Sequence, residues 1–332
     1  MTAPGEAEPA SLPLSVNLMP TGPIEQVVEL ARLAEERGFE RCWVYDEGLV
    51  TRDVYVTLAA VATATDRILI GPGITNPYVR HPGATAVAVA SLDELSGGRA
   101  FLGLGAGGGL TLDPLALTRR RPLAAVEQMV GVLRSLWAGD TVSARGPVFD
   151  FDRARLDFGR PDIEIILAGR GPRMIDLGGR VADGFYLSYV HKSLLPPTIA
   201  RLRAAQPGRA RPFRIVYSTM VATTDDEREA ARAQLSFRLV DSPPAVRRLV
   251  GVSDAHVDRL RDALAEGGPS VAARHVDPDW VDQFVIAGTR TEASKELRTL
   301  LADGGIDEFQ VPVTDLDRGA GLIDSTVDLL AG

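Results

Sequence analysis

Two adjacent acidic residues, Asp46 and Glu47, are the strongest candidates for proton transfer in this sequence. They follow the apolar run RCWVY, a pattern typical of a buried β-strand. A carboxyl group beside an apolar cleft has a raised pKa and can donate a proton near neutral pH. The alternative is structural, because the pair could also be exposed to solvent or cap a helix that begins near Asp53.

A second group of polar residues follows the apolar run at 68–70. The stretch GPGITNPYVRHPG places two glycines ahead of residues that could edge and orient a ligand: Thr75, Asn76, Tyr78, Arg80 and His81. We expect Arg80 and His81 to help orient a substrate. For His81, which precedes Pro82, a hydrogen-bonded position in a loop is the competing interpretation.

Two glycine-rich stretches could bind a cofactor. GLGAGG has the spacing G-x-G-x-x-G of a dinucleotide site, but that motif leads directly into a helix and the residues that follow predict none. Its glycines fit either a tight exit from a strand or a backbone that approaches a flat ligand. In LAGRGPRM, Gly169 and Gly171 lead into a helix with Pro172 in its first turn, whose free N–H groups would hold a phosphate. Arg170 and Arg173 favour this anion site over a plain loop.

The composition limits the partners. The chain has 332 residues and a net charge of −8 with both signs interspersed, which argues against nucleic acid. His191, His256 and His275 have no metal-ligand spacing, so we expect no metal. Cys42 is the only cysteine, so no intrachain disulfide can form. No apolar run is long enough to span a membrane and the N-terminus lacks a signal-peptide pattern, so we expect no membrane partner and a cytoplasmic location.

Strand-like apolar runs alternate with helical patterns, which indicates parallel β/α units. The runs are LPLSVNLM, RCWVY, RILIG, RAFLGLG, IEIILA, GFYLS, FRIVYSTMV and DEFQVPV, and helical patterns occur near 23–38, 53–64, 82–95, 122–138, 172–180, 193–205 and 291–302. This pattern predicts an α/β fold, an eight-stranded (β/α)8 TIM barrel.

We interpret residues 1–12 as a disordered lead-in and residues 13–332 as a single barrel domain with two insertions. These are a β-hairpin at about 141–160, before the fifth strand, and a helical insertion at about 223–290, before the eighth. In TIM barrels the chemistry lies on loops after the C-terminal ends of the strands. Asn17, the acidic pair, the polar stretch, both glycine stretches and Tyr189 all follow strand ends, so we expect a single site at this mouth.

Three segments together resemble the bacterial luciferase-like monooxygenase superfamily. They are WVYDE, the run GITNPYVRHPGATAVAVASLDELSGGRAFLGLGAGGG, and ILAGRGPRMIDLGGRVADGFYLS. Within that group the sequence is most similar to the methylenetetrahydromethanopterin reductase-like branch, whose members use the deazaflavin coenzyme F420. The likeness is dense over residues 12–190 and looser over 210–330.

The resemblance implies roles for specific residues. A cis peptide at Gly73-Ile74 would back the deazaflavin ring, with Asp46, Thr75 and Asn76 also contacting the cofactor. The residues that match the segment beside the ring are Leu104, Gly105, Ala106 and Gly107, and those that match the phosphate-binding segment are Ala168, Gly169, Arg170, Gly171 and Pro172. Two positions depart from the family. Several relatives have Asp-His where this chain has Asp46-Glu47, and the reductase has a glutamate where Asn17 stands.

The resulting hypothesis is an oxidoreductase that transfers a hydride between coenzyme F420 and a C=N or C=C bond of a small organic substrate. Glu47 or Asp46 would supply the proton, and Asn17, Tyr78 and Tyr189 would contact the substrate. One alternative is an FMN-dependent monooxygenase, and a second is a flavin- or deazaflavin-binding protein without turnover. We expect a homodimer.

Overall fold

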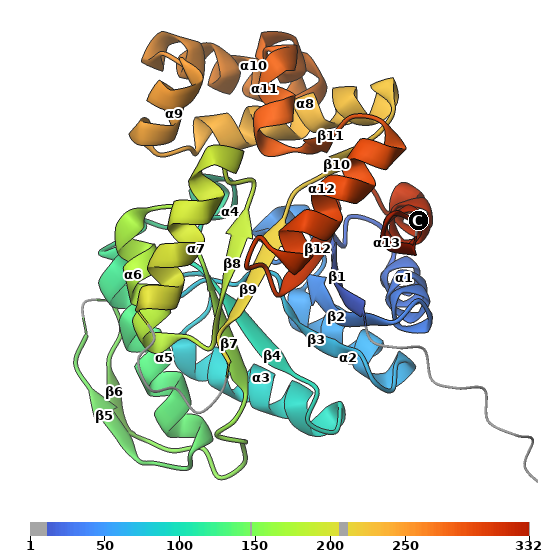
Figure 1. Cartoon of the computed structure of the whole chain (residues 1–332). Coiled ribbons are helices and arrows are strands. Elements are labelled where there is room, and N and C mark those ends of the chain that lie inside the picture. The colour runs from blue at the N-terminus through green and yellow to red at the C-terminus, as the bar shows by residue number, and fades with distance from the viewer. Residues whose placement is uncertain (1–11, 147, 206–211, 332) are drawn as a thin grey trace, which may run out of the picture.

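The computed structural model describes residues 12–146, 148–205 and 212–331. Eight parallel strands follow one another around a barrel in the order β3-β2-β1-β12-β9-β8-β7-β4 (Figure 1). Bridges from Ile70 to Ala100 and from Thr75 to Leu104 join β3 to β4 and close it. The strands are β1 (Leu12–Leu18), β2 (Phe39–Val44), β3 (Leu69–Pro72), β4 (Phe101–Leu104), β7 (Glu164–Ala168), β8 (Gly184–Ser188), β9 (Arg214–Ser218) and β12 (Glu308–Val313). The predicted TIM barrel is confirmed.

Helices cover the outside of the barrel. They are α1 (Ile24–Glu36), α2 (Val54–Ala64), α3 (Pro82–Leu95), α5 (Pro122–Trp137), α6 (Pro172–Val181), α7 (Leu195–Ala204), α12 (Arg290–Ala302) and α13 (Gly319–Ala331). In α1 the helical period brings Val27, Leu30, Ala31 and Ala34 to one buried face. Two helices were not predicted, namely α13 and the single turn α4 (Gly109–Leu112) that follows the GLGAGG glycines. Among the described residues no helix is long and apolar enough to cross a bilayer.

Both predicted insertions are present. β5 (Val142–Ala144) and β6 (Phe151–Ala154) form an antiparallel hairpin ahead of β7. Between β9 and β12 lie α8 (Asp225–Val240), α9 (Pro244–Val250), α10 (Asp254–Ala272) and α11 (Pro278–Phe284), which form a layer across one end of the barrel (Figure 1). These helices have their own apolar core, which includes Leu235, Leu239 and Leu260.

Two segments differ from the predicted boundaries. The run FRIVYSTMV was predicted as one strand, but β9 ends at Ser218 and a separate strand, β10 (Val221–Ala222), pairs with β11 (Ile286–Ala287). Between the two strands, the Thr219 hydroxyl donates to the Phe284 carbonyl, 2.6 Å away in the insertion. The predicted lead-in, 1–12, lies outside the described residues except for Leu12, which begins β1 and is therefore not part of a disordered segment.

Large side chains fill the barrel interior below the strand ends. Trp43, Phe101, Tyr186 and their neighbours form a cluster separate from the outer core. The Trp43 ring lies 4.4 Å from Phe101 and 5.7 Å from Tyr186, measured between ring centroids. A Cβ on Gly103 would lie 2.7 Å from the Trp43 indole, so this strand can pass the indole only as glycine. The filled interior leaves the C-terminal ends of the strands as the place for a ligand.

Candidate active site

A bulge after β3 forms one wall of the barrel mouth. The peptide bond between Gly73 and Ile74 is cis, as the resemblance implied. The Asn17 Nδ2 group donates to the Gly73 carbonyl at 2.9 Å, and Asn17 itself is fully buried. A Cβ on Gly73 would lie 2.7 Å from the Trp43 Cβ, so the bulge packs directly on the interior. Of the two residues, Gly73 is buried against Asn17 and Trp43, whereas Ile74 is partly exposed.

Thr75 connects the bulge to the acidic pair. Its backbone N–H donates to the Gly103 carbonyl at 3.0 Å, and its carbonyl accepts from Gly105 N–H at 2.9 Å. Its hydroxyl donates to Asp46 Oδ2 at 2.7 Å. A Cβ on Gly105 would meet the Ile74 Cδ1 atom at 2.4 Å, so β4 needs a glycine to approach the bulge this closely. The strand-four glycines therefore shape the mouth as well as easing the exit from the strand.

The two carboxyl groups lie in the mouth and are partly buried. Glu47 Oε2 accepts a hydrogen bond from the Thr111 hydroxyl at 2.6 Å. Burial raises the pKa of both Asp46 and Glu47 above the usual range, while the hydroxyls of Thr75 and Thr111 partly oppose this rise. The charge of Arg238 also favours the ionised form of Glu47. A buried carboxyl with a raised pKa is the arrangement expected of a general acid.

The other predicted residues of the polar stretch have structural partners. Asn76 is buried, and its Oδ1 accepts from the backbone N–H groups of Tyr78 and Val79 at 2.9 and 3.1 Å. The Tyr78 hydroxyl donates to the Arg120 carbonyl at 2.8 Å. These bonds fix the loop that carries the bulge.

Arg80 and His81 lie toward the rim. Arg80 pairs with Asp53 and stacks on Tyr55, with 5.0 Å between the guanidinium carbon and the ring centroid. His81 caps α3, and its ring lies 4.9 Å from the ring of Phe151 in the hairpin. The structure thus supports the loop interpretation of His81, which contacts neither Asp46 nor Glu47 among the described residues. The predicted roles of Arg80 and His81 in orienting a substrate remain predictions.

The segment from Ala168 to Pro172 lies at the end of β7, with Gly171 at the N-cap of α6. Within the described ranges, no backbone acceptor pairs with the N–H groups of Arg170, Gly171 or Arg173. A Cβ on Gly171 would meet no atom within 4 Å, so the space before the helix is open. An adjoining hollow is lined by Gly169 and Arg170 together with Tyr189, His191 and Ser242. This loop can hold an anion through backbone groups and the helix dipole.

Sequence reasoning missed three contributors to the mouth. Arg238 comes from α8, with its guanidinium carbon 4.8 Å from the centroid of the Tyr189 ring. Tyr45 and Tyr186 are buried beside it and interact electrostatically with its charge. Tyr45 directly precedes the acidic pair at the end of a predicted strand, which is a signal that could have been used. No comparable signal marks Arg238.

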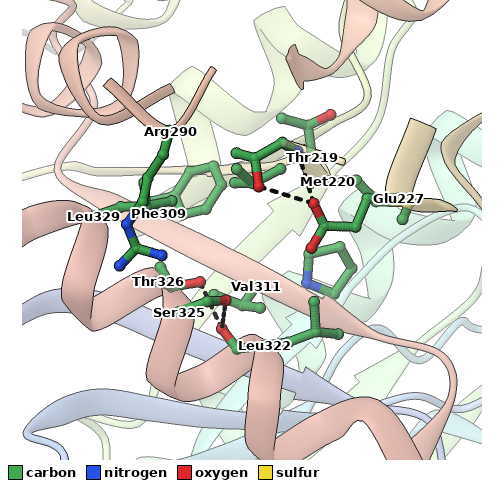
Figure 2. Close-up of a pocket in the computed structure, with 13 residues that line it drawn as sticks. Thr219, Met220, Glu227, Arg290, Phe309, Val311, Leu322, Ser325, Thr326 and Leu329 are labelled. Atoms are coloured by element: carbon green, nitrogen blue, oxygen red, sulfur yellow. Dashed lines mark hydrogen bonds between the residues drawn. The ribbon is translucent and has the colours of Figure 1, made fainter. Parts of the chain in front are cut away.

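A second hollow lies apart from the mouth. Figure 2 shows it between β12, α12 and α13, with Phe309, Val311 and Leu322 lining its apolar part and Arg290 and Glu227 at its edges. Glu227 is already bound by the backbone N–H groups of Thr223 and Thr224 as part of the α8 cap. In the described part of the chain, no group of three or more His, Cys, Asp or Glu side chains could hold a metal ion.

Comparison with known proteins gives a consistent picture. The profile of the family described as luciferase-like monooxygenase matches residues 9–308. The 5,10-methylenetetrahydromethanopterin reductase of Methanolobus tindarius is 30% identical over 296 residues, which cover 87% of this chain and 90% of that protein. The reductase of the same name from Archaeoglobus fulgidus is 32% identical over 283 residues, covering 82% and 85%.

A solved structure shows the same fold. The coenzyme F420 dependent tetrahydromethanopterin reductase from Methanopyrus kandleri superposes with a TM-score of 0.82 at 24% identity, covering 95% of this chain and 97% of that one. The similar proteins are named reductases, and the solved one is named as dependent on coenzyme F420. They confirm the predictions of an oxidoreductase and of this cofactor. On the strength of the profile match and of the identity to the reductases, the chain belongs to the luciferase-like monooxygenase family.

Proposed function

We propose that this protein is an oxidoreductase that uses coenzyme F420 and transfers a hydride between the deazaflavin and a C=N or C=C bond of a small organic substrate. The observation that carries this proposal is the pair of partly buried carboxyl groups with raised pKa, beside the bulge after β3 and in the same mouth as the open loop that precedes α6. The reaction needs a rigid wall for the ring, a proton donor and an anchor for the cofactor phosphate. We assign these roles to the bulge, the carboxyl groups and the loop, respectively.

The residues of the mouth fit a flat ring. The bulge at Gly73 and Ile74 is backed by Asn17 and Trp43, so it cannot retreat when a ligand packs on it. A Cβ on Gly108, beyond the β4 glycines, would meet no atom within 4 Å, which indicates open space along that loop. A rigid wall next to open space is the shape that stacking of a planar ring requires.

The anion loop fits a phosphate group. Among the described residues, three N–H groups at the start of α6 have no backbone acceptor, and the helix dipole adds a partial positive charge there. Arg119 donates to the Gly107 carbonyl at 2.8 Å, so the run Arg119 to Arg121 lies near the strand-four loop, where it can attract the acidic tail of the deazaflavin. Exposed contacts of this kind add about 0–1 kcal/mol each and weaken with salt.

Coenzyme F420, when bound, supplies a two-electron carrier for hydride transfer. The chain itself must hold the ring, exclude water and supply a proton. Glu47 is the preferred proton donor, because its Oε2 is held by Thr111 while no hydrogen bond engages Oε1 among the described residues. Asp46 is the second candidate and has the same arrangement with Thr75. Tyr189 lines the mouth and would contact the substrate, as would Tyr78 at its rim.

An FMN-dependent monooxygenase is the second candidate function, because FMN would use the same bulge and the same phosphate loop. A protein that binds the cofactor without turnover is the third, since Glu47 stands where several relatives have histidine. The cofactor can be identified directly. We expect protein purified from a host that makes both cofactors to retain F420.

Competitive titration provides the quantitative test. We expect the apoprotein to bind F420 more tightly than FMN, and to lose part of that preference at high salt, because only F420 carries an acidic tail. A clear preference for FMN would favour the monooxygenase. F420 binding weaker than about 100 μM and insensitive to salt would also contradict the proposal.

The homodimer also stays a prediction. Leu49 and Val50, which precede α2, and Val56 in its first turn are exposed by 76%, 58% and 60%. Large exposed apolar side chains close together in sequence are candidates for a contact surface. Sedimentation analysis of the natural protein and of a Val56→Glu variant would test whether this surface joins two copies.

A further inference from the structure

Arg238 is a cation in the barrel mouth that the proposed chemistry does not use. Its guanidinium is partly buried and lies over the Tyr189 ring, 4.8 Å from the ring centroid. In the part of the chain that the structure describes, this guanidinium makes no ion pair and no hydrogen bond. Burying a charge is unfavourable unless the charge gains a partner, so an unpaired guanidinium here requires an explanation.

The groups around Arg238 do not cancel its charge. Burial by itself lowers the pKa of Arg238, but Tyr45, Tyr189, Tyr186 and Glu47 raise it above its usual value. Burial raises the pKa of Tyr45 and Tyr189, so both are neutral at physiological pH. Burial also raises the pKa of Glu47, and no ion pair joins Glu47 to Arg238 among the described residues. A positive charge therefore remains in the mouth.

A second guanidinium strengthens this positive potential. Arg170 donates from Nη1 to the backbone carbonyl of Arg238 at 3.1 Å. Burial, followed by the charge of Arg238, lowers the pKa of Arg170 to about 10, so it stays protonated near neutral pH. Asp241, the exposed residue at the C-cap of α8, is the carboxylate that opposes this effect. Two guanidiniums thus share one region, and the acidic groups that interact with them are Asp241 and Glu47.

The backbone of Tyr189 supports a binding role for this cluster. Tyr189 has a φ of +47°, a left-handed conformation that is uncommon for a residue with a side chain. Tyr189 is 3% exposed, and its ring lies beneath Arg238. Stacking on an aromatic ring holds a guanidinium in one plane and leaves its N–H groups available. Unusual backbone conformations of this kind cluster at ligand-binding sites.

We propose that Arg238 binds a carboxylate or phosphate group of the substrate in the barrel mouth, with Arg170 adding to the attraction. The planar guanidinium matches such an oxyanion through two parallel hydrogen bonds. The substrate would then be a small organic acid or phosphate ester that carries its reducible bond within reach of Glu47. The identification of the anion as a substrate group rests on the proposed function, whereas the anion site itself does not.

Acetate and its neutral isostere acetamide test the site by ligand-observed NMR titration of the full chain, with and without bound F420. We expect acetate to bind at least about tenfold more tightly than acetamide, and Arg238→Gln to weaken acetate binding by about tenfold or more. Arg248→Gln is the matched control, because Arg248 is an exposed arginine of the same insertion and should leave acetate binding unchanged. Circular dichroism shows whether each variant is folded.

The outcomes separate the two sources of the anion. Acetate binding that persists with F420 bound supports a substrate group. Displacement of acetate by F420 would assign both arginines to the cofactor and overturn the proposal, as would equal acetate affinity in the natural protein and Arg238→Gln. If Arg238→Gln does not fold, Arg238→Lys is the variant to test, because it keeps the charge but loses the paired hydrogen bonds. Unchanged acetate affinity in Arg238→Lys would overturn the proposal. Acetate binding that depends on Arg238 in a protein that does not bind F420 would support the site while contradicting the proposed function.

Discussion

The two ends of the barrel contain similar charged residues in opposite arrangements. At the end where the strands begin, here called the floor, two arginines and three glutamates face one another: Arg41, Arg214, Glu40, Glu164 and Glu308. Arg41 Nε lies 2.8 Å from Glu308 Oε2, and Arg214 Nη1 lies 3.3 Å from the same oxygen. At the mouth, Asp46 and Glu47 are held by threonine hydroxyls, and Arg238 by a tyrosine ring.

We interpret this difference as a separation of structural charges from the charges that we propose to be functional. The floor charges satisfy one another, and Arg41, which is 2% exposed, cannot reach a ligand. The mouth charges are partly buried but remain unpaired with each other, so the folded protein keeps carboxyl groups with raised pKa and a free guanidinium. Perturbed ionisable groups without structural partners mark functional sites. Substitutions at the two ends should therefore affect different properties.

The largest expected effect is on stability, at the floor. Glu308→Gln removes the carboxylate that faces both Arg41 and Arg214, and leaves Arg41 buried with incomplete compensation. We expect a loss of about 3–5 kcal/mol in the free energy of unfolding, measured by denaturant titration. Asp324→Asn is the control, because it breaks an exposed pair with Arg37 and should cost about 0–1 kcal/mol. Similar losses in both variants would remove the distinction between buried and exposed pairs.

The next effect is on turnover, at the mouth. Glu47→Gln should reduce turnover by about 10² or more, the scale expected for loss of a general acid, with little change in F420 affinity. Because the pKa of Glu47 is raised in the folded protein, its stabilising contribution is present below the unfolded pKa and is lost as the pH rises through the folded pKa. The variant should therefore be at least as stable as the natural protein at neutral pH, with the difference vanishing in acid. Equal losses of binding and turnover would make Glu47 structural.

A smaller effect is expected on cofactor affinity, at the anion loop. Gly171→Pro removes a backbone N–H at the N-cap of α6 and should weaken F420 binding by about tenfold, or about 1.4 kcal/mol. Gly171→Ala is a matched control, because it keeps the N–H and its Cβ would meet no atom within 4 Å. Fluorescence titration measures both affinities. Unchanged affinity in the proline variant would show that the phosphate binds elsewhere.

Those parts of the fold that depend on local patterns were predicted well from the sequence. All eight barrel strands and most of the helices that cover them follow from hydrophobic period, and the positions of the acidic pair and of the loop before α6 follow from their places after strand ends. The single turn α4 was not predicted, because one turn of helix has little stability alone. Here α4 is held in part by the hydrogen bond from Thr111 to Glu47, a contact between residues distant in sequence.

Arg238 shows why the site was only partly predictable. In the sequence it is one of 36 basic residues, on a helix of an insertion with no readable motif. Its place in the mouth depends on how α8 packs across the strand ends, together with α10 and α11, and no local pattern encodes that packing. His81 shows the converse, because its residue type suggested chemistry while its position at the start of α3 gives it a capping role.

The subtlest expected effect distinguishes the two mouth carboxyls from each other. Each accepts a hydrogen bond from one threonine, and that bond favours the ionised form: Thr111 for Glu47 and Thr75 for Asp46. Removing the hydroxyl should raise the pKa of the carboxyl it serves by an amount that corresponds to about 0.5–1.5 kcal/mol. A general acid is active when protonated, so the activity should persist to higher pH in the variant that affects the true proton donor. We expect Thr111→Val to move the alkaline limb of the kcat/KM profile upward and Thr75→Val to leave it in place. The reverse result would assign the proton to Asp46, and no shift in either variant would mean that neither carboxyl controls this limb.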